Sequence, residues 1–186
     1  MPFGLNKDDP SMQYELMRAY AKNILLFAAG GHNHSIPFPA RKSEVFSIFA
    51  TDGKGSPYEC NPYCLDTKGY KFATLGAAVN SAWPVSLLPT RFLNKRGERR
   101  RSGTDISTAI VAGIAAFILD FVLVRNIDTK MYQMLRTRDG MERIFAKLVT
   151  SDSGGLDYIL PRNLFADHRS DDTIMVLIID VLAAWV

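Results

Sequence analysis

The sequence predicts an α/β fold, in which helices cover an open and mostly parallel β-sheet. Short, continuous apolar runs end at Gly, Pro, Asn or Asp, as strands covered on both faces do. Helical patterns alternate with these runs, and hairpin signals are few. With 186 residues, 47% of them hydrophobic, the chain is long enough for one core. We therefore expect a single domain, or part of one.

The N-terminal part of the chain alternates between helix and strand. Apolar residues recur at helical spacing over residues 11–22, and Ser11 is the candidate N-cap of this helix. The apolar runs 24–29, 45–50 and 71–79 are the predicted buried strands. This order is the one expected for a parallel sheet.

A long apolar segment, TAIVAGIAAFILDFVLV, occupies residues 108–124. It is a little short of the ~20 residues that span a bilayer, and it contains Asp120 and several small residues. A central helix buried on all sides explains it better than a membrane span does. We therefore expect no membrane partner.

The C-terminal part reads as helical. Amphipathic patterns over residues 128–138 and 141–149 predict two helices, broken at Asp139–Gly140. A loop through DSGG follows, and a very apolar helix is predicted from about residue 173 to 185. Three helices are therefore expected after residue 124.

Charge and termini exclude some classes of function. The net charge is +3, and the run KRGERRR at residues 95–101 has no interleaved aromatic residues that would stack on bases. It is interpreted as a solvated loop, so no nucleic-acid partner is expected. The N-terminal MPFGLNKDDP lacks the pattern of a secretory signal, which favours an intracellular protein.

The candidate metal ligands are few. Cys60 and Cys64, in CNPYC, supply half of a metal site at best; we interpret them as ordinary thiols, with a local disulfide as the alternative. His-x-His is a known ligand spacing, but no third ligand stands at a diagnostic spacing, and a polar loop is the favoured reading. No metal or other cofactor is predicted. The residues considered in that spacing are His32 and His34, with Asp52 or His168 as a third ligand.

Two turns stand where α/β proteins build their sites. The turn AAGGH, residues 28–32, follows a predicted strand, and open α/β sheets bind ligands at the carboxyl ends of strands. The turn SGTD, residues 102–105, opens the long helix, where backbone N–H groups and the helix dipole favour negative charge. Two such ends in one sheet can converge on one cleft.

These segments resemble the subtilases, the serine endopeptidases of the subtilisin type, and the fungal members most of all. FPARKSEVFSIFATD, residues 38–52, and FATLGAAVNSAWP, residues 72–84, match two successive strands of that family. SGTDISTAIVAGIAAFIL, from residue 102, is similar to the Gly-Thr-Ser signature around the nucleophile. The resemblance covers about residues 1–124.

Two further segments resemble parts of the family's substrate cleft. MPFG, residues 1–4, is similar to the Ser-x-Gly strand end that pairs with the substrate backbone, with Pro2 where serine is usual. LLFAAGGH, residues 25–32, is similar to the strand and turn that carry the oxyanion-hole asparagine, with His32 at the asparagine position. The resemblance implies substrate-binding roles for five residues: Phe3, Gly4, Ala29, Gly30 and Gly31.

The resemblance also implies a fold and a division of the chain. The expected fold is a partial subtilisin-like three-layer structure with a mostly parallel sheet and a central buried helix. Residues 1–124 would form the C-terminal part of a peptidase domain, and residues 125–186 a helical C-terminal extension packed on it. Phe38–Pro39 resembles a cis peptide of the family near the substrate cleft; a trans peptide is the ordinary alternative.

The catalytic machinery of the family is not intact in this chain. A subtilase uses an Asp/His/Ser triad, and the resemblance places the first two members upstream of MPFG. The serine position holds Asp105, whose carboxylate suits a helix N-terminus but has no role in acyl transfer. Ser107 is no substitute, because two residues along a helix turn a side chain by roughly 200°. Asp120 is ~22 Å from Asp105 by helix rise, too far to share a substrate bond.

Two functions follow from these observations. The first is a subtilisin-like endopeptidase that is truncated and degenerate, and inactive by itself. The alternative is a pseudoprotease that binds peptides or a partner protein. Because upstream strands of the family continue the sheet, we also expect an uncovered strand edge and apolar faces that a completing partner chain would cover.

Overall fold

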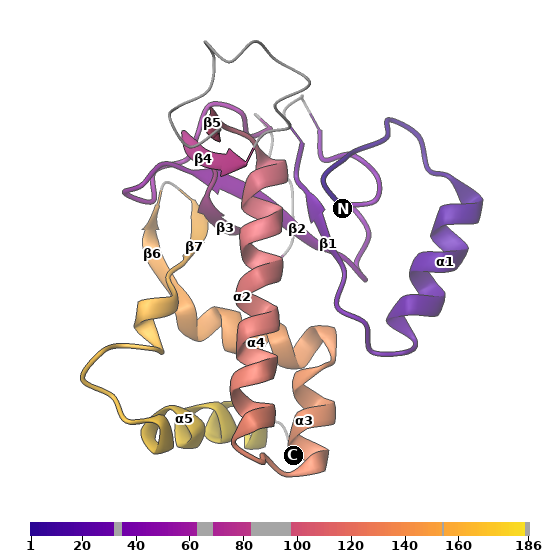
Figure 1. The fold of residues 1–186 in the computed structure, drawn as a ribbon. Helices are drawn as coiled ribbons and strands as arrows, with labels where there is room; N and C mark the ends of the chain where they lie inside the picture. The colour runs from indigo at the N-terminus through magenta and orange to yellow at the C-terminus, as the bar shows by residue number, and fades with distance from the viewer. Residues whose placement is uncertain (32–34, 63–68, 83–97, 154, 185–186) are drawn as a thin grey trace.

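The computed structural model describes residues 1–31, 35–62, 69–82, 98–153 and 155–184. Its centre is a five-stranded sheet flanked by helices (Figure 1). The strand order is β1-β2-β3-β7-β6, in which the first three pairs are parallel and β6 runs antiparallel to β7. The predicted α/β class with a mostly parallel sheet is confirmed.

The three predicted strands all form, but each is displaced or shorter than its apolar run. They are β1 (Phe27–Ala29), β2 (Phe46–Thr51) and β3 (Phe72–Leu75). The Gly76 N–H still donates to the Thr51 carbonyl, and the chain bends at residues 77–78, so β3 is shorter than its apolar run. Almost every residue of these strands is buried, as expected of strands covered on both faces.

Two antiparallel pairs correct the expectation of loops. Strand β4 (Val79–Ala82) pairs with β5 (Glu98–Arg101), so the described half of the basic run is a strand and not a solvated loop. Strand β6 (Val149–Ser153) pairs with β7 (Leu156–Ile159). Asp152 and Ser153 of the DSGG segment therefore lie in β6 rather than in a loop, and Gly155, which precedes β7, has φ +86°. The pairing of β7 with β3 is long-range, so local sequence signals did not reveal it.

Helix α1 (Pro10–Tyr20) begins earlier than predicted. Asp9, and not Ser11, is the N-cap: its carboxylate accepts the Met12 N–H at 2.8 Å, and Pro10 occupies the first turn, where its missing N–H costs nothing. Only Leu16 of this helix is buried. Helix α1 lies at the side of the molecule, away from the other helices (Figure 1).

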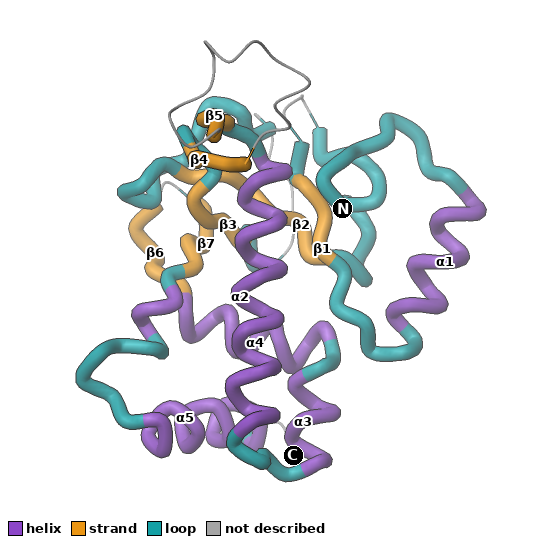
Figure 2. Tube along the Cα trace, viewed as in Figure 1, coloured by secondary structure: helices purple, strands orange, loops and turns teal. Residues whose placement is uncertain are grey.

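Helix α2 (Thr104–Val124) crosses the sheet and packs on β1, β2 and β3 (Figure 2). Val111, Ile118 and Val122 are fully buried in the core that α2 shares with the sheet and the C-terminal helices. Phe117 is 52% exposed and Val124 is 67% exposed, so the expectation of burial on all sides is wrong. By length and composition alone the helix also qualifies to cross a membrane, and 39% of its most apolar stretch is buried.

Three helices and one 3₁₀ turn follow: α3 (Thr129–Leu135), α4 (Arg138–Leu148), η3 (Pro161–Asn163) and α5 (Asp171–Ala183). The predicted break at Asp139–Gly140 is wrong, because both residues lie in the first turn of α4. The break falls at Arg136–Thr137, where the Thr137 side chain caps α4. Sequence pattern alone missed this cap because a glycine is the stronger breaker signal.

An aromatic cluster joins the sheet to α4. The rings of Phe27 and Phe46 stack at 5.1 Å between centroids, and Phe145 meets Phe46 and Phe72 edge-on. The segment after residue 124 therefore covers one face of the sheet and also adds two strands to it. The division of the chain at residue 124 stays a prediction.

Candidate functional site

A cavity of about 570 Å³ opens beside the carboxyl end of β1. It brings together four of the five predicted substrate-binding residues and Asp105, while Gly30 lies just behind the wall. His32, the predicted oxyanion-hole residue, lies outside the described residues. The full lining is Pro2, Phe3, Gly4, Asn6, Ala29, Gly31, Ser35, Pro37, Arg41, Cys60, Ser102, Gly103, Thr104 and Asp105.

The N-terminal wall of the cleft is held at both ends by backbone hydrogen bonds. The Met1 amino group donates to the Phe27 carbonyl at 2.6 Å, and its burial there lowers its pKa. Leu5 exchanges two hydrogen bonds with Phe38, at 2.7 and 3.0 Å. Between these anchors, Phe3 and Gly4 are exposed and make no backbone hydrogen bond to another described residue. Their backbone groups are therefore open to a further strand.

The glycines of the β1 turn are required by close packing. A Cβ on Gly30 would lie 2.6 Å from the Phe49 ring. Gly31 has φ +84°, and a Cβ there would lie 2.7 Å from Pro37. These contacts explain why the turn reads Gly-Gly, and they set the floor of the cleft.

The Phe38–Pro39 peptide, which is cis, lies behind the N-terminal wall, where Phe38 pairs with Leu5. Phe38 is fully buried, and the cations of Arg41 and Lys42 lie over its ring at 5.9 and 5.7 Å. Both cations pair with Asp8. Hydrogen bonds from Lys42 and Arg41 lower the pKa of Asp8.

The N-terminus of α2 forms the far wall. The Gly103 N–H donates to the Gly76 carbonyl at 2.9 Å, and the Thr104 hydroxyl donates to the Gly31 carbonyl at 3.4 Å. These bonds tie the helix start to the ends of β3 and β1. Asp105 is exposed, and its Oδ1 lies over Gly103, so closely that a Cβ on Gly103 would come within 2.1 Å of it. The carboxylate thus lies at the positive end of the helix dipole.

Ser107 points away from the cleft, as predicted. Its side chain is fully buried, and its hydroxyl donates to the carbonyls of Thr74 and Leu75 at 3.2 and 3.3 Å. Ser107 therefore fastens α2 to β3, and its oxygen is not available to a substrate.

Cys60 is a cleft residue that the sequence did not assign to the site. Burial raises the pKa of its thiol, and the charge of Asp105 raises it further, while the Thr104 N–H lowers it. At neutral pH the group is therefore a thiol and not a thiolate nucleophile. No local signal marks it, because Cys60 comes to α2 through a turn after β2. Its alternative disulfide partner, Cys64, lies outside the described residues.

The other candidate ligands do not assemble. Asp52 accepts the N–H groups of Lys54 and Ser56 at 2.8 and 2.9 Å, and these bonds lower its pKa. The Asp52 carboxylate therefore stabilises the turn that follows β2. His32 and His34 lie outside the described residues, and within the described part of the chain no three His, Cys, Asp or Glu side chains lie close enough to hold a metal.

Comparison with solved structures gives the fold. The prenylagaramide maturation protease PagA matches with a TM-score of 0.66 and 20% identity over 88% of this chain and 58% of PagA. The patellamide maturation protease PatA matches with a TM-score of 0.62 and 20% identity over 97% of this chain and 62% of PatA. No protein-family model and no curated protein matches the sequence.

These likenesses concern the fold, because the identities are low. The chain spans 58% of PagA and 62% of PatA, so it corresponds to a part of those structures. Over that part, this chain has the mostly parallel α/β fold of the subtilisin-like maturation proteases.

Proposed function

We propose that this chain is a pseudoprotease: a subtilisin-like domain, or the C-terminal part of one of the fungal type, that binds an extended peptide without cleaving it. One observation carries the proposal. An exposed carboxylate, Asp105, lies in the same cleft as the open backbone of Phe3 and Gly4. The cleft thus keeps a binding edge while its nucleophile position holds an acid.

Peptide binding is supported by the geometry of the N-terminal wall. An extended peptide binds by adding a strand to an exposed backbone edge, and main-chain hydrogen bonds supply much of the affinity. Phe3 and Gly4 offer such an edge, held in place by Met1 on one side and Leu5 on the other. The cavity of about 570 Å³ is of the size that commonly holds a ligand.

Hydrolysis is disfavoured by the chemistry of the far wall. Attack by Asp105 on a peptide would give an anhydride, and no histidine among the described residues lines the cleft to act as base. Ser107 is buried in hydrogen bonds to β3. Ser35 and Ser102 also line the cleft, but no histidine among the described residues accompanies them there. A serine activated by a paired base is therefore not found in the described part of the cleft.

A second candidate function is a working endopeptidase completed by another chain or segment. It is favoured by one observation: the similar structures are maturation proteases, of which this chain spans 58% to 62%. A completing chain would supply the triad aspartate and histidine. Asp105 would still stand at the nucleophile position, so we place this function second.

The test is retention of peptides by the purified chain, followed by mass spectrometry of what is retained. The probe is a mixture of unstructured decapeptides of random sequence, labelled with a fluorophore. Two variants on α2 form a matched pair: Asp105→Arg places a long side chain in the cleft, and Asp120→Arg makes the same change at an exposed position outside its lining.

We expect the chain to retain a subset of peptides intact, with at least tenfold weaker retention for Asp105→Arg and unchanged retention for Asp120→Arg. Equal retention by both variants would show that the peptides do not bind in this cleft. Time-dependent appearance of peptide fragments with the wild-type chain would replace it with the endopeptidase.

A further inference from the structure

Helix α5 is mostly apolar from Ile174 onward, yet only one face of it packs on the core. Ile174, Ile178 and Leu182, spaced four residues apart, are buried. Outside that face Val176 is 55% exposed and Leu177 is 37% exposed, beside the exposed Asp180. Neighbouring large apolar residues on a surface often mark a contact with another element. Helix α5 therefore has an apolar face without a partner among the described residues.

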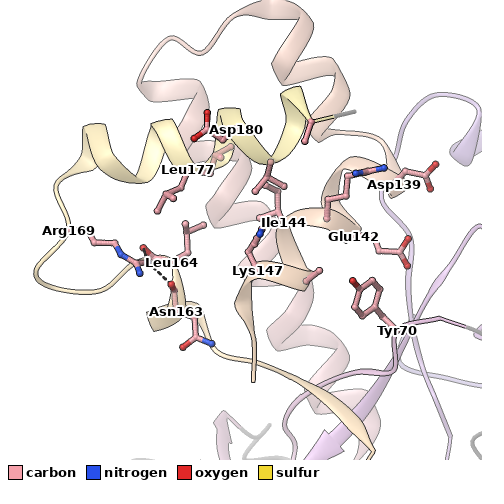
Figure 3. Close-up of a pocket in the computed structure, with 15 residues that line it drawn as sticks. Tyr70, Asp139, Glu142, Ile144, Lys147, Asn163, Leu164, Arg169, Leu177 and Asp180 are labelled. Atoms are coloured by element: carbon pink, nitrogen blue, oxygen red, sulfur yellow. Dashed lines mark hydrogen bonds between the residues drawn. The ribbon is translucent and has the colours of Figure 1, made fainter. Parts of the chain in front are cut away.

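This face borders a large groove between α4 and α5, with a volume of about 1140 Å³ (Figure 3). Leu177 and Val181 of α5 form one wall. Ile144 of α4 and Leu164, which follows η3, lie across from them. The groove exceeds the usual size of a small-molecule pocket, ~300–1,000 Å³, and its walls are helices. Its shape suits a helix laid along it.

The charges on the groove are of opposite sign on its two sides. Asp139 and Glu142 share one partner, Arg138, and with Arg143 and Lys147 helix α4 carries three positive charges against two negative ones. Lys147 on α4 and Asp180 on α5 line the groove without an ion pair to any described residue. The guanidinium of Arg169 donates to two backbone carbonyls and forms no ion pair with a carboxylate among the described residues. The α4 side and the Arg169 end are thus basic, and α5 is acidic.

We propose that the groove is filled by α5 of a second copy of this chain, in a twofold symmetric dimer. A twofold interface must be complementary to itself, and this surface is: it carries both the groove and an apolar helix to fill one. Docking places Leu177 of each copy in the other's groove and brings Asp180 toward Lys147 and Arg169 of the partner subunit. A lipid bilayer is a poorer occupant, because it would bury the charge of Asp180 without a partner.

The test is the molar mass of the wild-type chain and four variants, measured by light scattering and sedimentation from about 1 to 100 µM. Leu177→Asp places a charge in the groove, whereas Met17→Asp places the same charge at an exposed apolar residue of α1, outside the groove lining. Lys147→Glu and Asp180→Lys each reverse one charge, and the double variant restores opposite signs. Circular dichroism checks that each variant is folded.

We expect a dimer for the wild-type chain and for Met17→Asp, and a monomer for Leu177→Asp. Each charge reversal should weaken dimerisation about tenfold, and the double variant should recover most of that loss. A monomeric wild-type chain at every concentration would overturn the proposal, as would a double variant no better than the single ones. Binding of the monomer to phosphatidylcholine vesicles, lost in Leu177→Asp, would assign the face to a bilayer instead.

Discussion

Asp105 and Ser107 are two residues apart on α2, but they face opposite environments. The Asp105 carboxylate is exposed in the cleft, whereas the Ser107 hydroxyl is fully buried and donates to the carbonyls of Thr74 and Leu75. The helix start is thus built for structure on one side and open to ligand on the other.

The contact between Ser107 and the turn after β3 should be intolerant of one added methyl group. A Cβ on Gly76 would lie 2.2 Å from Ser107 Oγ and 2.6 Å from the Ala50 Cβ. We expect Gly76→Ala to lower the free energy of unfolding by about 2 kcal/mol or more, as overpacked cores do. Urea denaturation measures this. Gly53→Ala, where a Cβ meets nothing within 4 Å, is the control and should change stability by less than about 0.5 kcal/mol.

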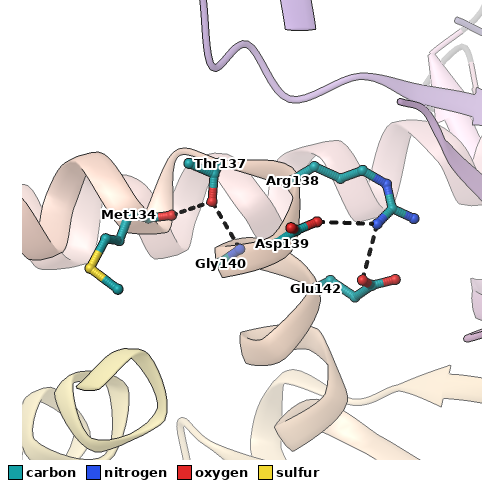
Figure 4. Close-up of polar contacts among 6 residues, drawn as sticks. All are labelled: Met134, Thr137, Arg138, Asp139, Gly140 and Glu142. Atoms are coloured by element: carbon teal, nitrogen blue, oxygen red, sulfur yellow. Dashed lines mark hydrogen bonds and ion pairs between the residues drawn. The ribbon is translucent and has the colours of Figure 1, made fainter. Parts of the chain in front are cut away.

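Glycine-to-alanine substitution should have opposite effects at Gly140, at the junction of α3 and α4, and at Gly113 in α2. The Thr137 hydroxyl donates to the Met134 carbonyl at 2.7 Å and accepts the Gly140 N–H at 3.0 Å (Figure 4). A Cβ on Gly140 would lie 2.1 Å from the Met134 oxygen, so Gly140→Ala should destabilise the fold. Gly113→Ala, in the open middle of α2, should stabilise it by roughly 0.5–1 kcal/mol through helix propensity. The Tm of each variant measures the change in stability. A change of the same sign for both variants would contradict the packing described.

Individual elements show which parts of the structure follow from the sequence and which do not. The apolar runs located β1, β2 and β3, and the turns around Gly31 and Asp105 were expected in one cleft; the structure places them there. The hairpin of β6 and β7 was missed, because its place in the sheet depends on a contact between Phe72 and Asp157, 85 positions apart in the chain. Cys60 was missed for the same reason, since only the fold brings it to α2. The Asp139–Gly140 break was wrong because Gly140 serves close packing and does not end a helix.

The thiol of Cys60 should report on the charge of Asp105. Burial raises the pKa of Cys60, and the Asp105 carboxylate adds to this effect. Removing that charge in Asp105→Asn should lower the pKa and increase the thiolate fraction at pH 8. The rate of alkylation by iodoacetamide, followed at Cys60 by peptide mapping, should therefore rise. An unchanged or lower alkylation rate would show that the charge of Asp105 does not raise the pKa of Cys60.

The acid limb of stability should depend on Asp8. Its pKa is lowered by hydrogen bonds from Lys42 and Arg41, so the folded state favours the charged carboxylate. The stabilisation is present above the ordinary pKa of 3.8 and is lost as the pH falls through the lower folded-state value. We expect Asp8→Asn to lower the Tm at pH 6, and the difference from the wild-type chain to shrink as the pH falls through the folded-state pKa. A Tm difference that does not shrink on acidification would assign the effect to something other than charge.

A pseudoprotease should have no activated serine in the cleft that contains Asp105. The most direct measurement is the intact mass of the chain after incubation with a fluorophosphonate, which labels activated serines. We expect no adduct on the wild-type chain, and none on Asp105→Ser, because a serine alone has no base to activate it. A stoichiometric adduct on Ser107 of the wild-type chain would contradict the account, since the structure holds that hydroxyl in hydrogen bonds to β3.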